Sequence, residues 1–198
     1  MFNIRKNKKY NFLIKKKFLN TKDFFIYLIV TFFVFFLIYL TIPKFYNFKS
    51  KEDLITSNLI QKFSIKIESI DKISYKIFPT PRLVIKKVPL ELVDKNITSK
   101  NSSLSLILEF SKILNIKSVN IKKIKIKDTD FKIKSENFYD LLKFEKKTKI
   151  VTIKKSNLLF QVDDKNIFSL NNINFINNNN LVLNARLFNK KINIKYIE

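Results

Sequence analysis

The chain has 198 residues, of which 39 are Lys or Arg and 16 are Asp or Glu, and its formal net charge is +23 at pH 7. It has no Cys and no His, which excludes disulfides, thiolate chemistry, zinc sites of the usual type and catalysis that depends on histidine. It also has no Gly, and its wealth of Ile, Lys, Asn and Phe, which have A/T-rich codons, indicates that genome composition accounts for much of the basicity.

An uncharged apolar stretch follows a basic tail at residues 1–22. Phe24–Ile42 consists mostly of Phe, Ile, Leu and Val. As a helix it would be about 28 Å long, close to the ~30 Å hydrocarbon core of a bilayer. It lacks the polar stripe of a core helix and the cleavage site of a signal peptide. We therefore expect a retained transmembrane helix at 24–42, with Tyr27 and Tyr39 at the headgroup level.

The charges that flank this helix predict its orientation. The tail before it has basic residues and no acidic ones, whereas Glu52 and Asp53 offset the lysines after it. Under the positive-inside rule, residues 1–22 form a cytoplasmic tail and residues 43–198 form one domain on the other side of the membrane. A basic arm is also typical of nucleic-acid binding, but topology explains it fully beside a spanning helix.

Two short helices are expected in a domain that is otherwise β. Lys51–Phe63 has the spacing of an amphipathic helix, and we expect it to cap the domain; the alternative is a helix that lies on the membrane surface. A second short helix is expected at Glu136–Lys146. The apolar residues that share one face of the first helix are Leu54, Ile55, Leu59 and Phe63.

From Ser64 onward apolar and polar residues alternate, as in half-buried strands. Because Gly is unavailable, Asn and Asp must supply the left-handed turn positions, and they cluster at 128–130, 163–166, 171–172 and 177–180. The expected fold is mainly β, with a curved antiparallel sheet that forms an open, groove-like meander. About ten strands at ~4.8 Å spacing give a sheet too short to bridge two membranes alone.

Three stretches of this region resemble the N-terminal region of the AsmA family, which are inner-membrane-anchored proteins of Gram-negative bacteria. Residues 57–92 resemble the family's helix, strand and Pro-x-Pro-x-Leu pattern, here at Pro79, Pro81 and Leu83. Residues 104–133 are similar to the family's strand units, and residues 135–144 resemble its Asn-aromatic-x-x-Leu element. The chain departs from the family in its lack of Gly, in Thr129 where the family has Pro, and in being several times shorter than most members.

The resemblance implies a periplasmic β domain whose apolar sheet face shields acyl chains in phospholipid transport and outer-membrane biogenesis. The expected partners are membrane lipids, either phospholipid or lipopolysaccharide, and an envelope protein that would pair with an open sheet edge. No catalytic residue, cofactor, metal or nucleic acid is expected. The residues expected to line the lipid groove are Ile65, Ile67, Ile77, Leu83, Ile85, Leu104, Leu106, Leu108, Ile121, Ile126, Phe131 and Ile133.

The residues by themselves support plainer interpretations. The Pro79 and Pro81 pair would mark a sheet edge or a chain reversal, and apolar alternation is more often a closed core than a groove. The acidic pairs Asp128/Asp130 and Asp163/Asp164 could bind a metal or act as acid and base, but turn chemistry explains them better.

Three other functions fit parts of the sequence. One is a single-span structural or interaction protein of the cell envelope. Another is the jellyroll component of lipopolysaccharide transport, which matches in size and topology but not in the Pro-x-Pro region. A membrane-tethered nucleic-acid binder would suit the charge, but the chain has no Arg cluster.

Overall fold

The computed structural model describes residues 21–115, 118–137, 150–163, 165–177 and 181–196. The chain divides into two compact units, Met1–Ile38 and Tyr39–Glu198. Helix α1 (Thr21–Thr41) begins in the first unit, and its last turn belongs to the second.

Helix α1 is apolar on every side, and its large side chains from Phe24 to Ile38 are exposed, except for the half-buried Phe36. Its best apolar window has a mean hydropathy of 2.7 and is only 6% buried. A core helix of a globular protein would be mostly buried, so this exposure separates α1 from that class. Among the described residues it is the one helix that is long and apolar enough to cross a membrane.

The last turn of α1 belongs to the β unit because hydrogen bonds hold it there. The Tyr39 hydroxyl donates to the Phe110 carbonyl at 2.9 Å, and the Tyr75 hydroxyl donates to the Leu40 carbonyl at 2.9 Å. Leu40 and Pro43 are buried. The compact β unit therefore starts at Tyr39.

Helix α2 (Glu52–Phe63) follows the short 3-10 turns η1 (Ile42–Phe45) and η2 (Lys49–Lys51), and it confirms the first predicted helix. It buries Ile55, Leu59 and Phe63 against the start of the sheet, whereas Leu54 is exposed. The Glu52 carboxylate accepts bonds from Lys49 Nζ at 2.6 Å and from the Ile70 amide at 2.9 Å. These two bonds lower the pKa of Glu52 and fasten the first turn of α2 to the domain.

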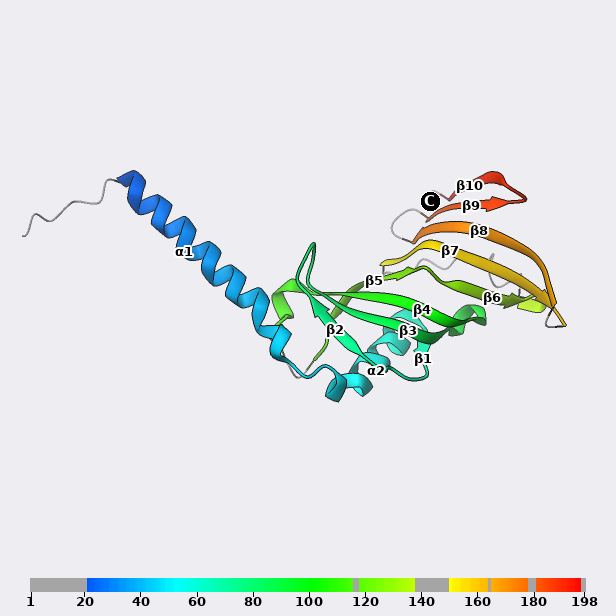
Figure 1. The fold of residues 1–198 in the computed structure, drawn as a ribbon, viewed down its shortest axis with the longest axis horizontal. Coiled ribbons are helices and arrows are strands. Elements are labelled where there is room, and N and C mark those ends of the chain that lie inside the picture. The colour runs from blue at the N-terminus through cyan, green and yellow to red at the C-terminus, as the bar shows by residue number, and fades with distance from the viewer. Residues whose placement is uncertain (1–20, 116–117, 138–149, 164, 178–180, 197–198) are drawn as a thin grey trace, which may run out of the picture. The chain divides into compact units, whose positions relative to one another are not determined.

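The ten strands of the described residues form one sheet in the order β1-β3-β4-β5-β7-β8-β9-β10, with β2 on β3 and β6 between β4 and β7 (Figure 1). Two 3-10 turns, η3 (Val93–Lys95) and η4 (Phe110–Lys112), follow β3 and β4. The strands are β1 (Ile65–Ile67), β2 (Ile73–Lys76), β3 (Arg82–Leu92), β4 (Ile97–Leu108), β5 (Ile121–Lys127), β6 (Asp130–Lys134), β7 (Ile150–Val162), β8 (Lys165–Asn177), β9 (Leu181–Leu187) and β10 (Lys190–Tyr196). The mainly β fold with a curved sheet is confirmed.

Strand β7 departs from the expected antiparallel order. It runs parallel to both β5 and β6, while β4 runs antiparallel to both on their other side. Strands β5 and β6 are therefore one strand interrupted at Asp128–Thr129. The expected turn at 128–130 is a kink rather than a chain reversal, and the sheet is mixed.

A line of β-bulges crosses the sheet at matched positions. Four register shifts lie at Lys86–Lys87 in β3, 100–101 in β4, Lys154–Lys155 in β7 and Asn171–Asn172 in β8, in line with the kink at 128–129. Lys87, Asp128, Lys155 and Asn172 have positive φ angles of 56°, 50°, 51° and 51°. Bulges bend strands and increase their twist, so this bulge line accounts for the curvature of the sheet.

Asn and Asp supply only some of the left-handed positions. Asp128, Asp163 and Asn172 have positive φ as expected, but so do Lys87, Lys155, Ser64 and Phe188. The described residues of the second predicted helix, Glu136 and Asn137, lie in a 3-10 turn, η5 (Ser135–Asn137). The rest of that helix and most of the 177–180 cluster lie outside the described residues.

Candidate functional site

The residues predicted to line a groove lie on one face of the first half of the sheet. All of them except Ile77 are buried, and Leu83, Ile85, Leu104, Leu106, Ile126 and Ile133 are completely so. The buried ones belong to β1, β3, β4, β5 and β6, and the apolar side of α2 is buried with them, whereas Ile77 lies in the loop after β2. In this structure these residues form a closed core, not a surface that a ligand can reach.

The same face continues across the sheet beyond β5, where it is buried at Leu158, Phe160, Ile173 and Ala185 but accessible along one row. Directly paired residues on neighbouring strands share a face, and an unbroken apolar row runs through these pairs. Its first members are fully buried, Ile153, Phe175 and Leu183 are half-buried, and Ile194 is 48% exposed. The row consists of Ile85, Leu104, Ile126, Ile153, Phe175, Leu183 and Ile194.

We call the accessible part of this face, Ile153, Phe175, Leu183, Ile192 and Ile194, the open lane. Its members come from β7, β8, β9 and β10, and none was among the predicted groove residues. The alternation in β9 and β10 was visible in the sequence, but the pairing that joins these strands to the core face was not. The open lane is an apolar surface that an acyl chain could cover.

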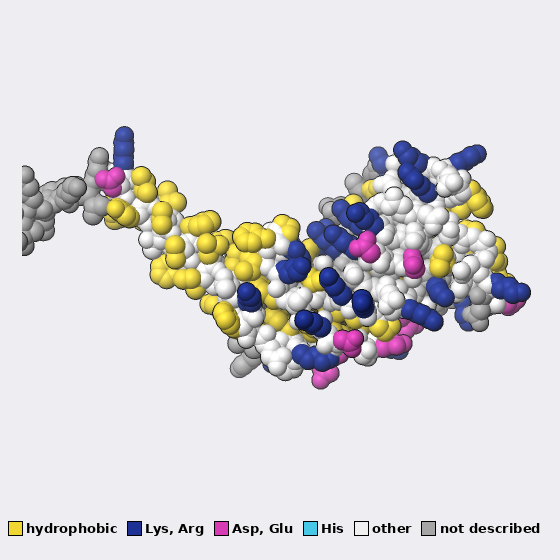
Figure 2. All heavy atoms as spheres, viewed as in Figure 1, with side chains coloured by type: hydrophobic (Ala, Val, Ile, Leu, Met, Phe, Trp, Pro, Cys, Tyr) yellow, Lys and Arg dark blue, Asp and Glu magenta, His cyan; other side chains and the backbone are white. Residues whose placement is uncertain are grey.

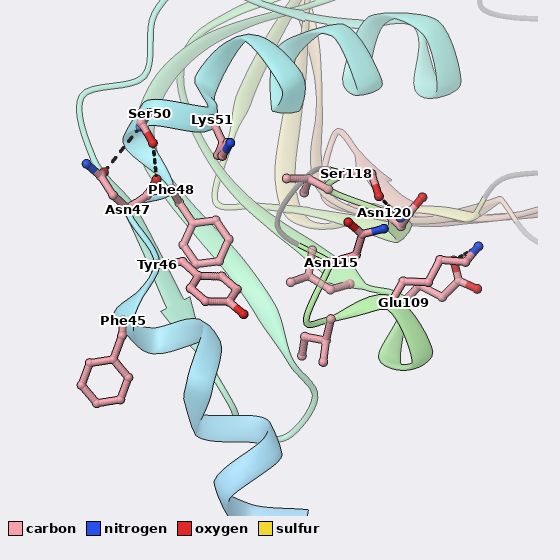
Figure 3. A pocket seen from close by; sticks show the side chains of 14 residues that line it. Phe45, Tyr46, Asn47, Phe48, Ser50, Lys51, Glu109, Asn115, Ser118 and Asn120 are labelled. Atoms are coloured by element: carbon pink, nitrogen blue, oxygen red, sulfur yellow. Dashed lines mark hydrogen bonds and ion pairs between the residues drawn. The ribbon is translucent and has the colours of Figure 1, made fainter.

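A pocket of about 280 Å³ lies in the β unit between residues 45–51, which follow α1, and the connection from β4 to β5. Figure 3 shows Tyr46 and Phe48 on one side, with Asn115 and Asn120 on the other and Lys51 at the edge; Phe45 points away. Two aromatic rings, amide groups and a cation suit a small polar or anionic group that has an apolar neighbour. Sequence reasoning missed this pocket because its two walls are far apart in the chain.

Polar contacts fix the pocket walls. Asn47 Oδ1 accepts bonds from the backbone amides of Lys49 at 3.2 Å and Ser50 at 3.4 Å. Across the pocket, Asn120 Nδ2 donates to Ser118 Oγ at 2.9 Å, and Lys112 Nζ lies 3.1 Å from Glu109 Oε2. No carboxylate of the described residues lies within salt-bridge distance of Lys51 Nζ, which leaves this cation available to an anion.

The opposite face of the central strands is basic. Lys123, Lys125 and Lys127 alternate with Ile124 and Ile126 along β5, so their side chains project from the face that α2 does not cover. Burial, followed by repulsion from Lys123, Lys154, Lys127 and Arg82, lowers the pKa of Lys125. Figure 2 shows Lys and Arg spread over the visible face of the β unit with fewer Asp and Glu among them.

The described residues of the acidic pairs occupy the kink between β5 and β6 and the turn after β7. Asp130 Oδ1 accepts a bond from Asn157 Nδ2 at 2.7 Å, and Asn157 Oδ1 accepts from the Asn172 amide at 3.1 Å, which links three strands at the bulge line. Asp163 lies in the turn between β7 and β8, and Asp164 lies outside the described residues. The described part of the chain contains no group of three or more acidic side chains placed to hold a metal ion.

The two prolines mark a chain reversal, as the residues alone predicted. Pro79 and Pro81 lie in the loop between β2 and β3, and the Phe78–Pro79 peptide bond is cis. The Pro81 carbonyl accepts a bond from the Leu108 amide at 3.0 Å, so the loop is tied to the end of β4. Leu83, the third motif residue, is completely buried.

Comparison of the chain with protein-family models, with curated protein sequences and with solved structures found no match.

Proposed function

We propose that this protein is a membrane-anchored carrier that shields lipid acyl chains on the apolar face of its β-sheet. The observation that carries the proposal is the apolar row from Ile85 to Ile194. Its first half is a closed core that fixes the sheet, and its second half, the open lane, leaves the same face accessible. An acyl chain needs an apolar lining and no polar anchor, which is what the open lane offers.

The pocket beside the end of α1 also supports the proposal, because it could bind the headgroup of a lipid. Its aromatic and amide lining and Lys51 suit a phosphate-bearing headgroup. It lies within ten residues of the end of the apolar helix, where headgroups of a surrounding bilayer would be. A headgroup site near the membrane and an apolar surface farther along the sheet are the two elements that lipid transfer requires.

The resemblance to the AsmA family and the charge distribution extend the proposal to a location. We place the N-terminal tail in the cytoplasm, α1 in the inner membrane of a Gram-negative cell and the β unit in the periplasm. The cargo is phospholipid or lipopolysaccharide, and the process is lipid transport in outer-membrane biogenesis.

A second function is favoured by a separate observation. Strand β10 is the last strand of the sheet, and its outer edge has no partner strand among the described residues. An envelope protein could add a strand there, in which case the chain would be a single-span scaffold and the apolar row would only be its core.

Photo-crosslinking in cells separates these two functions. The full chain is expressed in a Gram-negative host with a photoreactive phenylalanine analogue at Leu183, in the open lane. The matched control has the analogue at Val182, the adjacent and equally half-buried residue, which points to the opposite face. We expect lipid adducts at position 183 and none at 182, and mass spectrometry of the adduct identifies the lipid.

Two outcomes would contradict the carrier function. Equal lipid labelling at 182 and 183 would show contact with lipid that is not specific for the open lane. A folded protein without lipid adducts at position 183 would favour the scaffold function. Protein adducts formed by the same analogue at Lys191, in the edge strand, would support the scaffold function directly.

A further inference from the structure

Three phenylalanine side chains are exposed around the last turn of α1. Phe45 is 84% exposed, Phe78 is 71% exposed and Phe110 is 44% exposed. Phe45 ends the 3-10 turn after α1, Phe78 lies in the loop between β2 and β3, and Phe110 begins η4 after β4. We call these three residues the aromatic collar.

The fold brings the three segments of the collar to one place. The Tyr39 ring packs on the Phe110 ring with a centroid distance of 5.4 Å, and its hydroxyl bonds to the Phe110 carbonyl. The Tyr75 hydroxyl bonds to the Leu40 carbonyl, and Phe78 follows three residues later. Both Tyr39 and Leu40 lie in the apolar stretch 24–42, so the collar is at the level where the chain leaves that stretch.

Each collar residue has a lysine within two positions: Lys44 precedes Phe45, Lys76 precedes Phe78 and Lys112 follows Phe110. Lys44 and Lys76 are exposed, and Lys112 is exposed while paired with Glu109. Exposed aromatic rings beside lysines are typical of segments that bury rings at the headgroup boundary and hold cations among anionic headgroups. In water alone, three exposed phenylalanines at one place would be unfavourable.

We propose that the aromatic collar inserts into the bilayer surface and seats the β unit on the membrane that holds α1. The partner is the lipid surface itself, with anionic phospholipid favoured by Lys44 and Lys76. This inference rests on the membrane-spanning part of the proposed function but not on the open lane. With the collar inserted, the β unit is bound to the membrane surface and is not connected to the membrane by α1 alone.

The chain supplies its own spectroscopic test because it contains no Trp. Single variants Phe45→Trp, Phe78→Trp and Phe110→Trp of the full chain are reconstituted in vesicles of phosphatidylcholine and phosphatidylglycerol, with or without bromine on the acyl chains. The matched control is Phe188→Trp, since Phe188 is 80% exposed at the turn between β9 and β10, away from the collar.

We expect brominated lipid to quench about half of the emission of the three collar variants, because rings seated at ~5–10 Å depth lie near the bromine atoms. Their emission should also be blue-shifted relative to Phe188→Trp, which should not be quenched. Replacing phosphatidylglycerol by phosphatidylcholine should reduce the quenching at 78 and 110.

Three results would overturn the inference. The first is that Phe78→Trp and Phe110→Trp have the same emission maximum as the Phe188→Trp control and are not quenched by brominated lipid. Quenching at position 45 alone would also overturn it, because Phe45 follows the anchor directly and needs no seating of the domain to reach lipid. Equal quenching at 188 would show that the domain meets the bilayer by another surface. Circular dichroism identifies any variant that fails to fold, and the Leu183 crosslink reports on the lipid carrier function independently.

Discussion

The two halves of the sheet have the same alternation of apolar and polar residues but different environments. From β1 to β6, the apolar face is closed, and Leu104, Leu106 and Ile124 have no solvent exposure. From β7 to β10, the same face is still buried at Leu158, Phe160, Ile173 and Ala185, but it is half-buried at Phe175 and Leu183 and exposed at Ile194. Helix α2 buries its apolar side against β1, in the first half. Periodicity therefore identifies the face that a strand presents, and the covering elements decide whether that face is core or surface.

The largest effect on the free energy of unfolding is expected from a comparison of one leucine in each half of the sheet. Leu106→Ala should lower the free energy of unfolding by about 2–5 kcal/mol, because Leu106 is fully buried in the closed half. Leu183→Ala should cost less than about 1.5 kcal/mol, since less apolar surface is buried there. Urea unfolding of the full chain in mild detergent, followed by circular dichroism, measures both. Equal losses would mean that the open lane is closed in solution and would break the comparison.

A smaller effect concerns the attachment of the closed half to the last turn of α1. Burial, and then the neighbouring Tyr39, raises the pKa of Tyr75 to about 12 from an ordinary value of 10.0. Tyr75→Phe removes the bond to the Leu40 carbonyl and should cost about 1 kcal/mol. Because the pKa is raised in the folded state, the contribution of the neutral phenol is complete below pH 10 and is lost as the pH rises to 12.

Unfolding curves of wild type and Tyr75→Phe, recorded at several pH values from about 8 to about 12, measure this contribution. The two free energies of unfolding should converge at the alkaline end. A constant difference across the range would show that the Tyr75 hydroxyl is not shielded from water.

The third prediction concerns β7, the first strand of the second half of the sheet. Two variants in this strand should change the free energy of unfolding in opposite directions. Thr152 Oγ1 is buried, and no group of the described residues lies within hydrogen-bond reach of it. Thr152→Val should therefore stabilise the fold by about 1 kcal/mol. Ser156 is equally buried, but its hydroxyl donates to the Lys154 carbonyl at 3.1 Å and accepts from the Thr129 amide at 3.3 Å. Ser156→Ala should destabilise by a similar amount, and thermal unfolding of both variants measures the contrast.

The smallest effect concerns the basic face behind the closed half. Lys125 has a lowered pKa because of burial and like-charged neighbours, so its protonated form is unfavourable in the folded state. Lys125→Gln should stabilise the fold by a few tenths of a kcal/mol at low salt, and by less at high salt. As the pH rises toward the ordinary lysine value of 10.5, wild type should gain stability relative to the variant. An effect independent of salt and pH would exclude charge repulsion as its cause.

Much of the fold was predictable because it depends on local patterns. The apolar helix at 24–42, the amphipathic helix at 51–63 and the β character of the rest follow from residue periods. The parallel pairing of β7 was not predictable, because Asp128 has the composition of a turn and only tertiary contacts make it a kink. The positive φ angles at Lys87 and Lys155 were missed because lysine carries no turn signal.

The candidate site was less predictable than the fold. The pocket joins residues 45–51 to residues 108–120, and nothing local in either segment signals the other. The apolar row depends on register between strands, which periodicity does not give. Phe45, Phe78 and Phe110 are ordinary apolar residues in the sequence. The hydrogen bonds from Tyr39 to Phe110 and from Tyr75 to Leu40, which tie β2 and η4 to the last turn of α1, are not visible there.

The bulge line has a consequence for how the length of this chain can change in evolution. Each extra residue at a bulge resets the phase of the strand beyond it, so Leu158 and Phe160 point to the core only because Lys154–Lys155 precede them. Deletion of Lys155 alone would turn both side chains to the opposite face, while neighbouring strands with their own bulges kept theirs. Insertions and deletions are therefore compatible with this fold at its hairpin loops, whereas within β3, β4, β7 and β8 a change in length requires a matching change in the adjacent strands.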